Sequence, residues 1–257
     1  MNRKMVFFDI DGTLLDHHTR TIPASTREAI AELRRLGHEV AIATGRGPFM
    51  FRSIREELDI HTYVSLNGQY VVHEGSVVRS QPIPKPVLER LHESAKTSNH
   101  PIVYMAAETM KCAETDHPFV VESLSSLELD MPDYHPNYFH EEDIYQAMVF
   151  CEAEAEEAYR QGFDLQFIRW HRYSMDVLPF GGSKAEGVQA MIERLGFRRE
   201  DVYAFGDNLN DIEMLRFAGT GVAMGNAPET VKLVADVVTR DVGDDGIWHG
   251  LKAVGLL

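Results

Sequence analysis

Cysteine is scarce in this chain. Of the 257 residues only Cys112 and Cys151 are cysteines, and they show neither a C-x-x-C pair nor a zinc-ligand spacing. We expect two reduced thiols, as in a cytoplasmic protein, rather than a disulfide. No apolar run has the length of a transmembrane helix, and the apolar stretch at residues 5–8 is too short for a signal peptide. The sequence therefore predicts a cytoplasmic location.

Positive charge is also scarce. The 25 Lys and Arg residues are outnumbered by 40 Asp and Glu residues, which gives a formal net charge of -15 at pH 7. Binding to nucleic acid or to an anionic membrane needs clustered positive charge, so we expect neither partner. A small anionic substrate remains compatible with this balance if a metal ion, a lysine or backbone N–H groups bind it locally.

Several catalytic signatures are missing as well. The sequence contains no H-E-x-x-H zinc motif, no G-x-S-x-G nucleophile elbow and no G-x-G-x-x-G dinucleotide loop. Residues 181–184 read Gly-Gly-Ser-Lys and resemble the end of a P-loop, but the full G-x-x-x-x-G-K-[ST] pattern is absent. These absences exclude the corresponding peptidase, esterase, dehydrogenase and P-loop classes.

The pattern that is present is typical of an α/β protein. Short apolar runs end abruptly in polar or glycine clusters, as expected of strands buried on both faces, and helical periodicities lie between them. The predicted strands are residues 5–8, 40–43, 63–66, 202–205 and 221–224, and the predicted helices are 25–36, 185–195, 211–217 and 229–235. This alternation predicts a doubly wound parallel sheet.

The middle of the chain has a different pattern. Pro82, Pro84 and Pro86 mark a boundary, and residues 84–181 contain helix and strand candidates with few polar clusters at strand ends. We therefore predict an α+β domain at 84–181 inserted into a core domain formed by 1–83 and 182–257. Helices are expected at 86–97 and 153–160, and strands at 102–106, 147–151, 164–169 and 174–178.

Acidic residues follow two of the predicted strands. Asp9 and Asp11 come directly after the first strand, and in extended chain their side chains point to the same side. Asp207 and Asp211 follow a later strand at the i, i+4 spacing of one helix face. Because parallel strands end at one edge of a sheet, these carboxylates should converge, and grouped carboxylates without His or Cys favour Mg²⁺.

Two further segments suggest a phosphate site. Thr44 and Gly45 follow a predicted strand and offer a hydroxyl and a backbone N–H. Lys184 stands at a predicted helix start, where the helix dipole disfavours a cation unless an anion is nearby. Asn67 follows another strand and belongs at the same edge. Taken alone, each of these features is also compatible with an ordinary turn, helix cap or surface lysine.

Taken together, the segments resemble a known family. Residues 9–14 (DIDGTL), 44–46 (TGR), Lys184 and 206–211 (GDNLND) resemble, in order, the four motifs of the haloacid dehalogenase-like (HAD) hydrolase superfamily. Residues 65–68 (SLNG), 221–229 (GVAMGNAPE), 235–236 and 245–246 resemble its Cof-type branch, subfamily IIB. The resemblance implies a Rossmann-like core with an inserted C2B-type α+β cap.

The resemblance also implies a phosphatase mechanism with roles for individual residues. Asp9 would attack phosphorus to form an aspartyl-phosphate, and Asp11 would act as the acid and then the base. Asp9, Asp207 and the backbone carbonyl of Asp11 would bind Mg²⁺, with Asp211 supporting the metal's waters. Phosphate oxygens would be held by Ile10, Thr44, Gly45, Lys184 and Asn210, and the substrate side would include Arg46, Asn67 and Gly68.

The resemblance implies a small metabolite as substrate, such as a sugar phosphate, a nucleotide or a cofactor phosphate. Three alternatives stay open from the sequence. A phosphosugar mutase of the same superfamily would return the phosphoryl group to a sugar instead of to water. A phospho-receiver domain shares the acidic pocket, the Thr and the Lys, but it lacks an inserted domain. A binding module with a relict site would have lost motif residues, all of which are present here.

Overall fold

The computed structural model describes residues 3–127 and 129–257 and divides into two compact units. The first unit contains the described residues up to Arg46, Phe51–Ser80 and Ser183–Leu257. The second contains Gly47–Met50 and Gln81–Gly182. The two predicted boundaries between the core and the inserted domain lie within three residues of the boundaries at 80/81 and 182/183. Residues 47–50, however, were assigned to the core.

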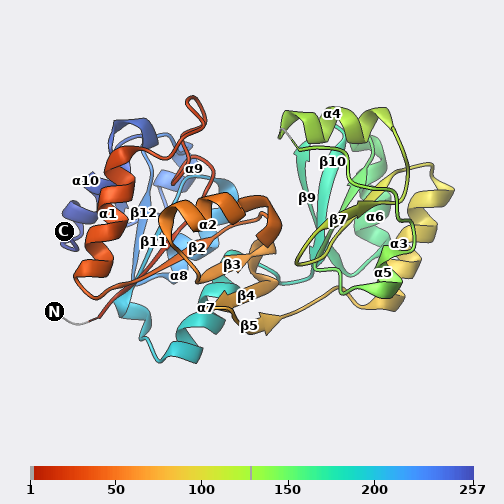
Figure 1. Cartoon of the computed structure of the whole chain (residues 1–257). Coiled ribbons are helices and arrows are strands. Elements are labelled where there is room, and N and C mark those ends of the chain that lie inside the picture. Colours follow the sequence, from red (N-terminus) through yellow and green to blue (C-terminus); the bar gives the residue numbers. More distant parts are fainter. Residues whose placement is uncertain (1–2, 128) are drawn as a thin grey trace. The chain divides into compact units, whose positions relative to one another are not determined.

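The first unit is built on a sheet whose parallel strands end at one edge (Figure 1). Among the described residues the strand order is β13-β12-β11-β1-β2-β3-β4-β5, and the pairs from β13 to β3 are parallel. These parallel strands are β1 (Met5–Phe8), β2 (Glu39–Ala43), β3 (Tyr63–Ser65), β11 (Val202–Gly206), β12 (Thr220–Ala223) and β13 (Val237–Val238). The predicted parallel α/β core is confirmed.

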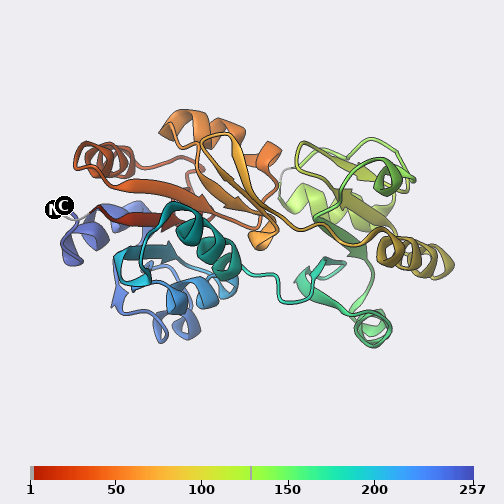
Figure 2. The same ribbon diagram turned by 90° about the horizontal axis from the view of Figure 1, so that it is seen from below.

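Helices cover both faces of this sheet (Figure 2) because its strands are apolar on both sides. In β1, Val6 and Phe8 pack in one core cluster, and Met5 and Phe7 pack in the other. Each fully buried side chain of this size contributes about 1.5–3 kcal/mol. The first cluster includes residues of α1 (Ala24–Arg35), α2 (Arg52–Leu58) and α10 (Gly246–Ala253), and the second of α7 (Lys184–Leu195), α8 (Ile212–Phe217) and α9 (Glu229–Lys232).

An antiparallel hairpin extends the sheet beyond β3, and the sequence prediction missed it. β4 (Tyr70–His73) pairs with β3 and with β5 (Ser76–Ser80). Its two turn residues, Glu74 and Gly75, both have positive φ (46° and 76°), as a two-residue hairpin turn of the primed type requires. The predicted helix at 229–235 was also too long, since α9 ends at Lys232.

The second unit is the α+β domain that its pattern predicts. Its strands are ordered β7-β6-β8-β10-β9, all antiparallel. They are β6 (Ile102–Met105), β7 (Met110–Cys112), β8 (Gln146–Phe150), β9 (Leu165–His171) and β10 (Ser174–Pro179). Its helices are α3 (Lys85–Thr97), α4 (Pro118–Ser126), α5 (Tyr138–Glu141) and α6 (Glu156–Gly162).

Short 3₁₀ helices complete the described chain: η1 (Pro48–Phe51), η2 (Leu66–Gly68), η3 (Ala153–Ala155), η4 (Arg199–Asp201), η5 (Leu209–Asp211) and η6 (Val242–Asp244). Cys112 and Cys151 are both buried and free, as predicted. Across 3–127 and 129–257, no helix is both long and apolar enough to cross a bilayer.

One carboxyl group lies in the middle of the second unit's sheet. Asp176 of β10 pairs with Met148 of β8 and Ile168 of β9. Burial raises the pKa of Asp176 to about 7, although side-chain hydrogen bonds with Trp170 and Gln146 act in the opposite direction. An unfolded aspartate titrates at about 3.9. The folded state therefore binds this proton more tightly than the unfolded state. The contribution of Asp176 to the free energy of unfolding consequently falls as the pH rises from about 4 to about 7.

We predict that Asp176→Asn stabilises the protein increasingly between about pH 4 and pH 7 and by a constant amount above. The free energy of unfolding of the variant, relative to the unsubstituted protein, should rise by roughly 1.4 kcal/mol per pH unit in that window. Urea unfolding of both proteins at several pH values measures this difference, because the other titrating groups cancel. A difference that does not change with pH would contradict the assignment.

Candidate active site

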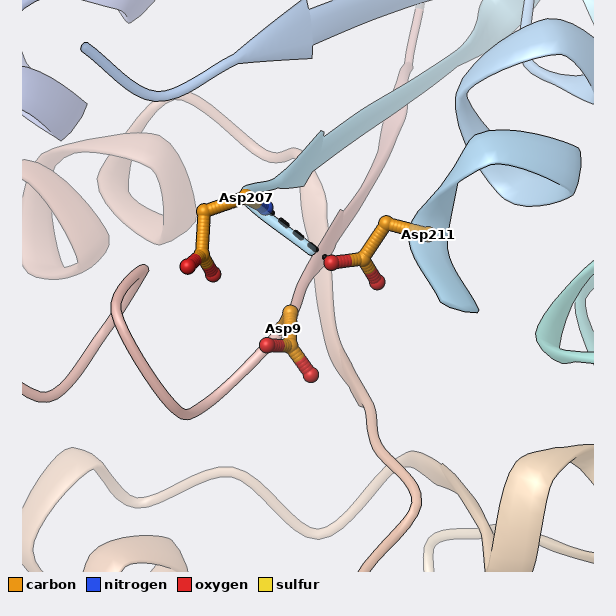
Figure 3. A group of neighbouring side chains, drawn as sticks. All are labelled: Asp9, Asp207 and Asp211. Carbon is orange, nitrogen blue, oxygen red and sulfur yellow. Dashed lines mark hydrogen bonds between the residues drawn. The ribbon is translucent and has the colours of Figure 1, made fainter. Parts of the chain in front are cut away.

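Three buried carboxylates from two separate segments meet at the carboxyl edge of the parallel sheet. Asp9 follows β1, Asp207 follows its neighbour β11, and Asp211 closes η5. One carboxylate oxygen from each lies within 4.8 Å of the others, and Figure 3 shows the three side chains around a common point. The Asp9 N–H donates to the Phe205 carbonyl at 3.0 Å, which extends the strand pairing up to the site.

Lys184 joins this group from the first turn of α7. Its Nζ donates to Asp9 Oδ1 and to Asp211 Oδ1, both at 2.6 Å, and the residue is only 1% exposed. Burial lowers the pKa of Lys184, but the adjacent Asp211 and Asp9 carboxylates raise it more, so the pKa lies above its ordinary value. The lysine is therefore a fixed positive charge beside the Asp9 carboxylate.

Asp211 holds the loop that carries Asp207. Its Oδ2 accepts hydrogen bonds from the backbone N–H groups of Asp207 at 3.0 Å and Asn208 at 2.9 Å (Figure 3 draws the first). Its Oδ1 accepts from Lys184. With both oxygens engaged inside the protein, Asp211 fixes the positions of the loop and of the lysine.

The Asp207 carboxylate is held from two sides. Its Oδ1 accepts from Thr13 Oγ1 at 3.0 Å, and its Oδ2 accepts from Asn226 Nδ2 at 3.4 Å. Burial, followed by repulsion from Asp211, raises the pKa of Asp207 to about 7. Neither Thr13 nor Asn226 was assigned a role from the sequence, although both lie within stretches that carry the family resemblance.

The pKa of Asp9 is raised in the same way, by burial and by neighbouring carboxylates. Burial is the largest cause that raises the pKa of Asp9 well above its ordinary value, and Lys184 acts in the opposite direction. Neighbouring carboxylates raise it further: Asp211, Asp207 and Asp11. Three grouped carboxylates against one lysine leave an excess of negative charge. This set of hard oxygen donors suits a divalent cation that prefers oxygen ligands.

Gly12 is required where the chain passes Asp207. Its φ is 79°, and a Cβ there would lie 2.3 Å from Asp207 Oδ2 and 2.8 Å from His17 Nε2. Ile10, two residues before Gly12, is buried. Its carbonyl accepts hydrogen bonds from the Leu14 N–H at 3.0 Å and the Leu15 N–H at 2.8 Å, which close the turn. A side chain at position 12 would displace the carboxylate.

Asp11 lies apart from the three grouped carboxylates. Its carboxylate accepts from Arg46, with Arg46 Nε 2.8 Å from Oδ2 and a second, shorter hydrogen bond from Nη2 to Oδ1. The Asp11 side chain is 40% exposed. In the structure the Arg46 guanidinium thus forms a two-point ion pair with Asp11, and its place on the substrate side stays a prediction.

Thr44, Gly45 and Asn67 lie together at the ends of β2 and β3. The Asn67 N–H donates to the Thr44 carbonyl at 3.2 Å, and a Cβ on Gly45 would come within 3.1 Å of the Asn67 amide. Asn210 Nδ2 donates to Asn67 Oδ1 at 3.4 Å, which links them to the loop after β11. These residues therefore share the edge at which the carboxylates meet.

Gly68 has a packing position instead. Its φ is 91°, and a Cβ would lie 2.1 Å from the carbonyl oxygen of Ser183, next to the start of α7. The close approach of two backbones explains why this position holds glycine, and its place on the substrate side stays a prediction.

Comparison with known proteins identifies the family. A model described as haloacid dehalogenase-like hydrolase matches residues 6–251. The chain belongs to the haloacid dehalogenase-like hydrolases. YkrA of Bacillus subtilis is 49% identical to this hydrolase over 100% of both chains. The pyridoxal phosphate phosphatase YbhA of Escherichia coli is 30% identical over 96% of this chain and 97% of its own.

A solved structure gives the subclass. The sugar phosphatase BT4131 of HAD subclass IIB superposes with a TM-score of 0.86 at 29% identity, covering 99% of this chain and 100% of its own. The hydrolase described here is accordingly a phosphatase of the Cof-type, subclass IIB branch, with an α/β core and a cap domain. The predicted resemblance, fold and enzyme class are confirmed.

We predict that Lys184→Met lowers the free energy of unfolding by about 3–5 kcal/mol in metal-free buffer, because it leaves Asp9 and Asp211 buried without their cation. Urea unfolding in EDTA measures the loss. Lys96→Met on the exposed face of α3 is the matched control and should change stability by less than about 0.5 kcal/mol. Equal stability of the two variants would show that Lys184 does not balance the buried carboxylates.

Proposed function

We propose that this phosphatase is magnesium-dependent and hydrolyses phosphate monoesters of small metabolites through an aspartyl-phosphate on Asp9. The observation that supports this most directly is the placement of Lys184 Nζ at 2.6 Å from both Asp9 and Asp211, beside Asp207. In this proposal the Asp9 carboxylate, the Lys184 ammonium group and the carboxylate oxygens of Asp207 lie within reach of a single phosphoryl group.

Asp9 is the nucleophile. One of its oxygens attacks phosphorus while the bond from phosphorus to the ester oxygen breaks, and Asp11, protonated and released from Arg46, gives its proton to that oxygen. In the second step Asp11 takes a proton from water, the water oxygen bonds to phosphorus, and the bond to Asp9 breaks. Phosphate is released, and both aspartates return to their starting forms. Two displacements thus share one acid/base group.

Charge is the main obstacle to this attack. Two unit negative charges at 4 Å repel by about 4 kcal/mol at an effective dielectric constant of about 20. Lys184 offsets part of this repulsion. Asp9, Asp207 and the Asp11 backbone carbonyl would hold Mg²⁺, which when bound neutralises charge on the phosphoryl oxygens. Asp211, which accepts a hydrogen bond from Lys184, would also support the water molecules bound to the cation.

The phosphoryl oxygens meet donors from several segments. The Thr44 hydroxyl, the Gly45 and Ile10 backbone N–H groups and Lys184 face the transferred group, with Asn210 beside them. These donors are fixed by the sheet edge before substrate arrives, so they need little reorganisation in the transition state. Asn67, Gly68 and Arg46 are proposed to lie on the substrate side, where Arg46 also pairs with Asp11.

We propose that residues 84–181, which lie within the second unit, form the cap and that residues 1–83 and 182–257 form the core. The proposed substrate class is small phosphorylated metabolites, which include sugar phosphates, nucleotides and cofactor phosphates. One relative is named for pyridoxal phosphate and one structural neighbour for sugar phosphates, so related chains act on different members of this class. We further propose a cytoplasmic location, supported by the two buried free thiols.

We predict that Asp9→Asn lowers phosphate release at least about a thousandfold, because the amide cannot form the acyl phosphate. The variant should keep its fold, since the side chains are isosteric and Lys184 can still donate to the amide oxygen. A phosphate-release assay over a panel of metabolites, with Mg²⁺ or with EDTA, measures both claims. Near-normal turnover by the variant would refute the nucleophile, and full activity in EDTA would refute the metal.

Asp11 can be tested through the leaving group. We predict that Asp11→Asn lowers kcat/KM far more for an alkyl phosphate than for p-nitrophenyl phosphate, because only the alkoxide needs a proton to leave. The informative quantity is the ratio of the two losses, which a general loss of folding does not change. If both substrates slow by the same factor, Asp11 is not the acid.

A further inference from the structure

Asn226 links three segments at the edge of the site. It lies in the turn after β12, and its Nδ2 donates to the Gly12 carbonyl at 2.9 Å and to Asp207 Oδ2 at 3.4 Å. Its Oδ1 accepts from the Val242 N–H at 3.0 Å. The amide thereby connects the loops that follow β1, β11 and β13.

The orientation of this amide follows from its partners. A backbone N–H only donates, so the amide oxygen must face Val242. The NH₂ group then faces the Gly12 carbonyl and the Asp207 carboxylate, both of which accept. Among short side chains, asparagine supplies one acceptor and a two-proton donor at this spacing. Aspartate would place an acceptor against two acceptors.

The Asp207 carboxylate is oriented by hydrogen bonds to both of its oxygens. Thr13 donates to Oδ1 only, and a single hydrogen bond leaves the carboxylate plane free to turn about that contact. The bond from Asn226 to Oδ2 adds a second fixed point, since it comes from a different segment. Partners behind a ligand carboxylate orient it, and their loss typically costs about 10–100-fold in metal affinity.

We propose that Asn226 is a positioning residue that orients the Asp207 carboxylate for cation binding. The inference rests on the proposed function, in which Asp207 holds Mg²⁺. It gives a role to the 221–229 stretch, whose sequence marks the branch of the family but has no assigned part in the chemistry. Asn226 acts through Asp207 and the Gly12 carbonyl.

The test measures Mg²⁺ binding directly. MgCl₂ is titrated calorimetrically into the full-length, chelator-treated protein without substrate. Asn226→Ala should weaken the apparent Mg²⁺ affinity by roughly tenfold or more. Its melting temperature in EDTA should stay within a few degrees of the unsubstituted protein. Asn137→Ala, at an exposed asparagine whose side chain forms no cap hydrogen bond, is the matched control and should leave the affinity unchanged.

Two companion variants separate the possible failures. Thr13→Val removes the hydroxyl from the other oxygen of the same carboxylate, and Asp207→Asn removes the ligand charge. If both weaken Mg²⁺ binding while Asn226→Ala stays within twofold of the unsubstituted protein, the inference is wrong and the metal site stands. Unchanged binding in Asp207→Asn would overturn the proposed metal site and the inference with it. If Asn226→Ala melts far lower in EDTA, Asn226→Ser provides the same comparison with a smaller cavity.

Discussion

The contact of Lys184 with Asp9 and Asp211 is the interaction on which the rest of the site depends. A buried carboxylate without a cation beside it would be protonated or would unfold the loop that carries it, because burial strongly disfavours an isolated charge. One ammonium group at 2.6 Å from both carboxylates offsets this cost. Its second partner, Asp211, also binds the backbone of the loop after β11, so charge balance and loop geometry are fixed by the same few atoms.

The parallel sheet makes this contact possible. Asp9 and Lys184 are 175 residues apart in sequence, and Asp207 is supplied by the strand beside β1. A parallel arrangement brings the ends of distant strands to one edge without any contact having to form between neighbours in sequence. Long loops and an inserted domain can therefore lie between the segments while the edge itself stays packed.

Much of this arrangement could be predicted from the sequence because it rests on simple rules. An apolar run that stops at a polar residue marks both a buried strand and its end, so Asp9, Thr44 and Asp207 could be placed at the edge. The directions of individual side chains could not be predicted in this way. The pairing of Arg46 with Asp11 depends on a rotamer chosen in the folded protein, and the position of Gly68 depends on the later chain segment that packs against it. The hairpin after β3 was missed because its Glu-Gly turn is weaker as a signal than Asn-Gly.

The close approach at Gly12 limits how this sequence can change. A methyl group at position 12 would meet the carboxylate of a residue 195 positions later in the chain, and the local backbone is left-handed as well. Substitution there is therefore penalised twice, once by local conformation and once by a distant segment. Compensation would have to come from a shift of the loop after β11, which Asp211 and Lys184 already hold. Position 12 should thus tolerate replacement less than the fully buried apolar positions around it, where one hydrophobic side chain can often be exchanged for another.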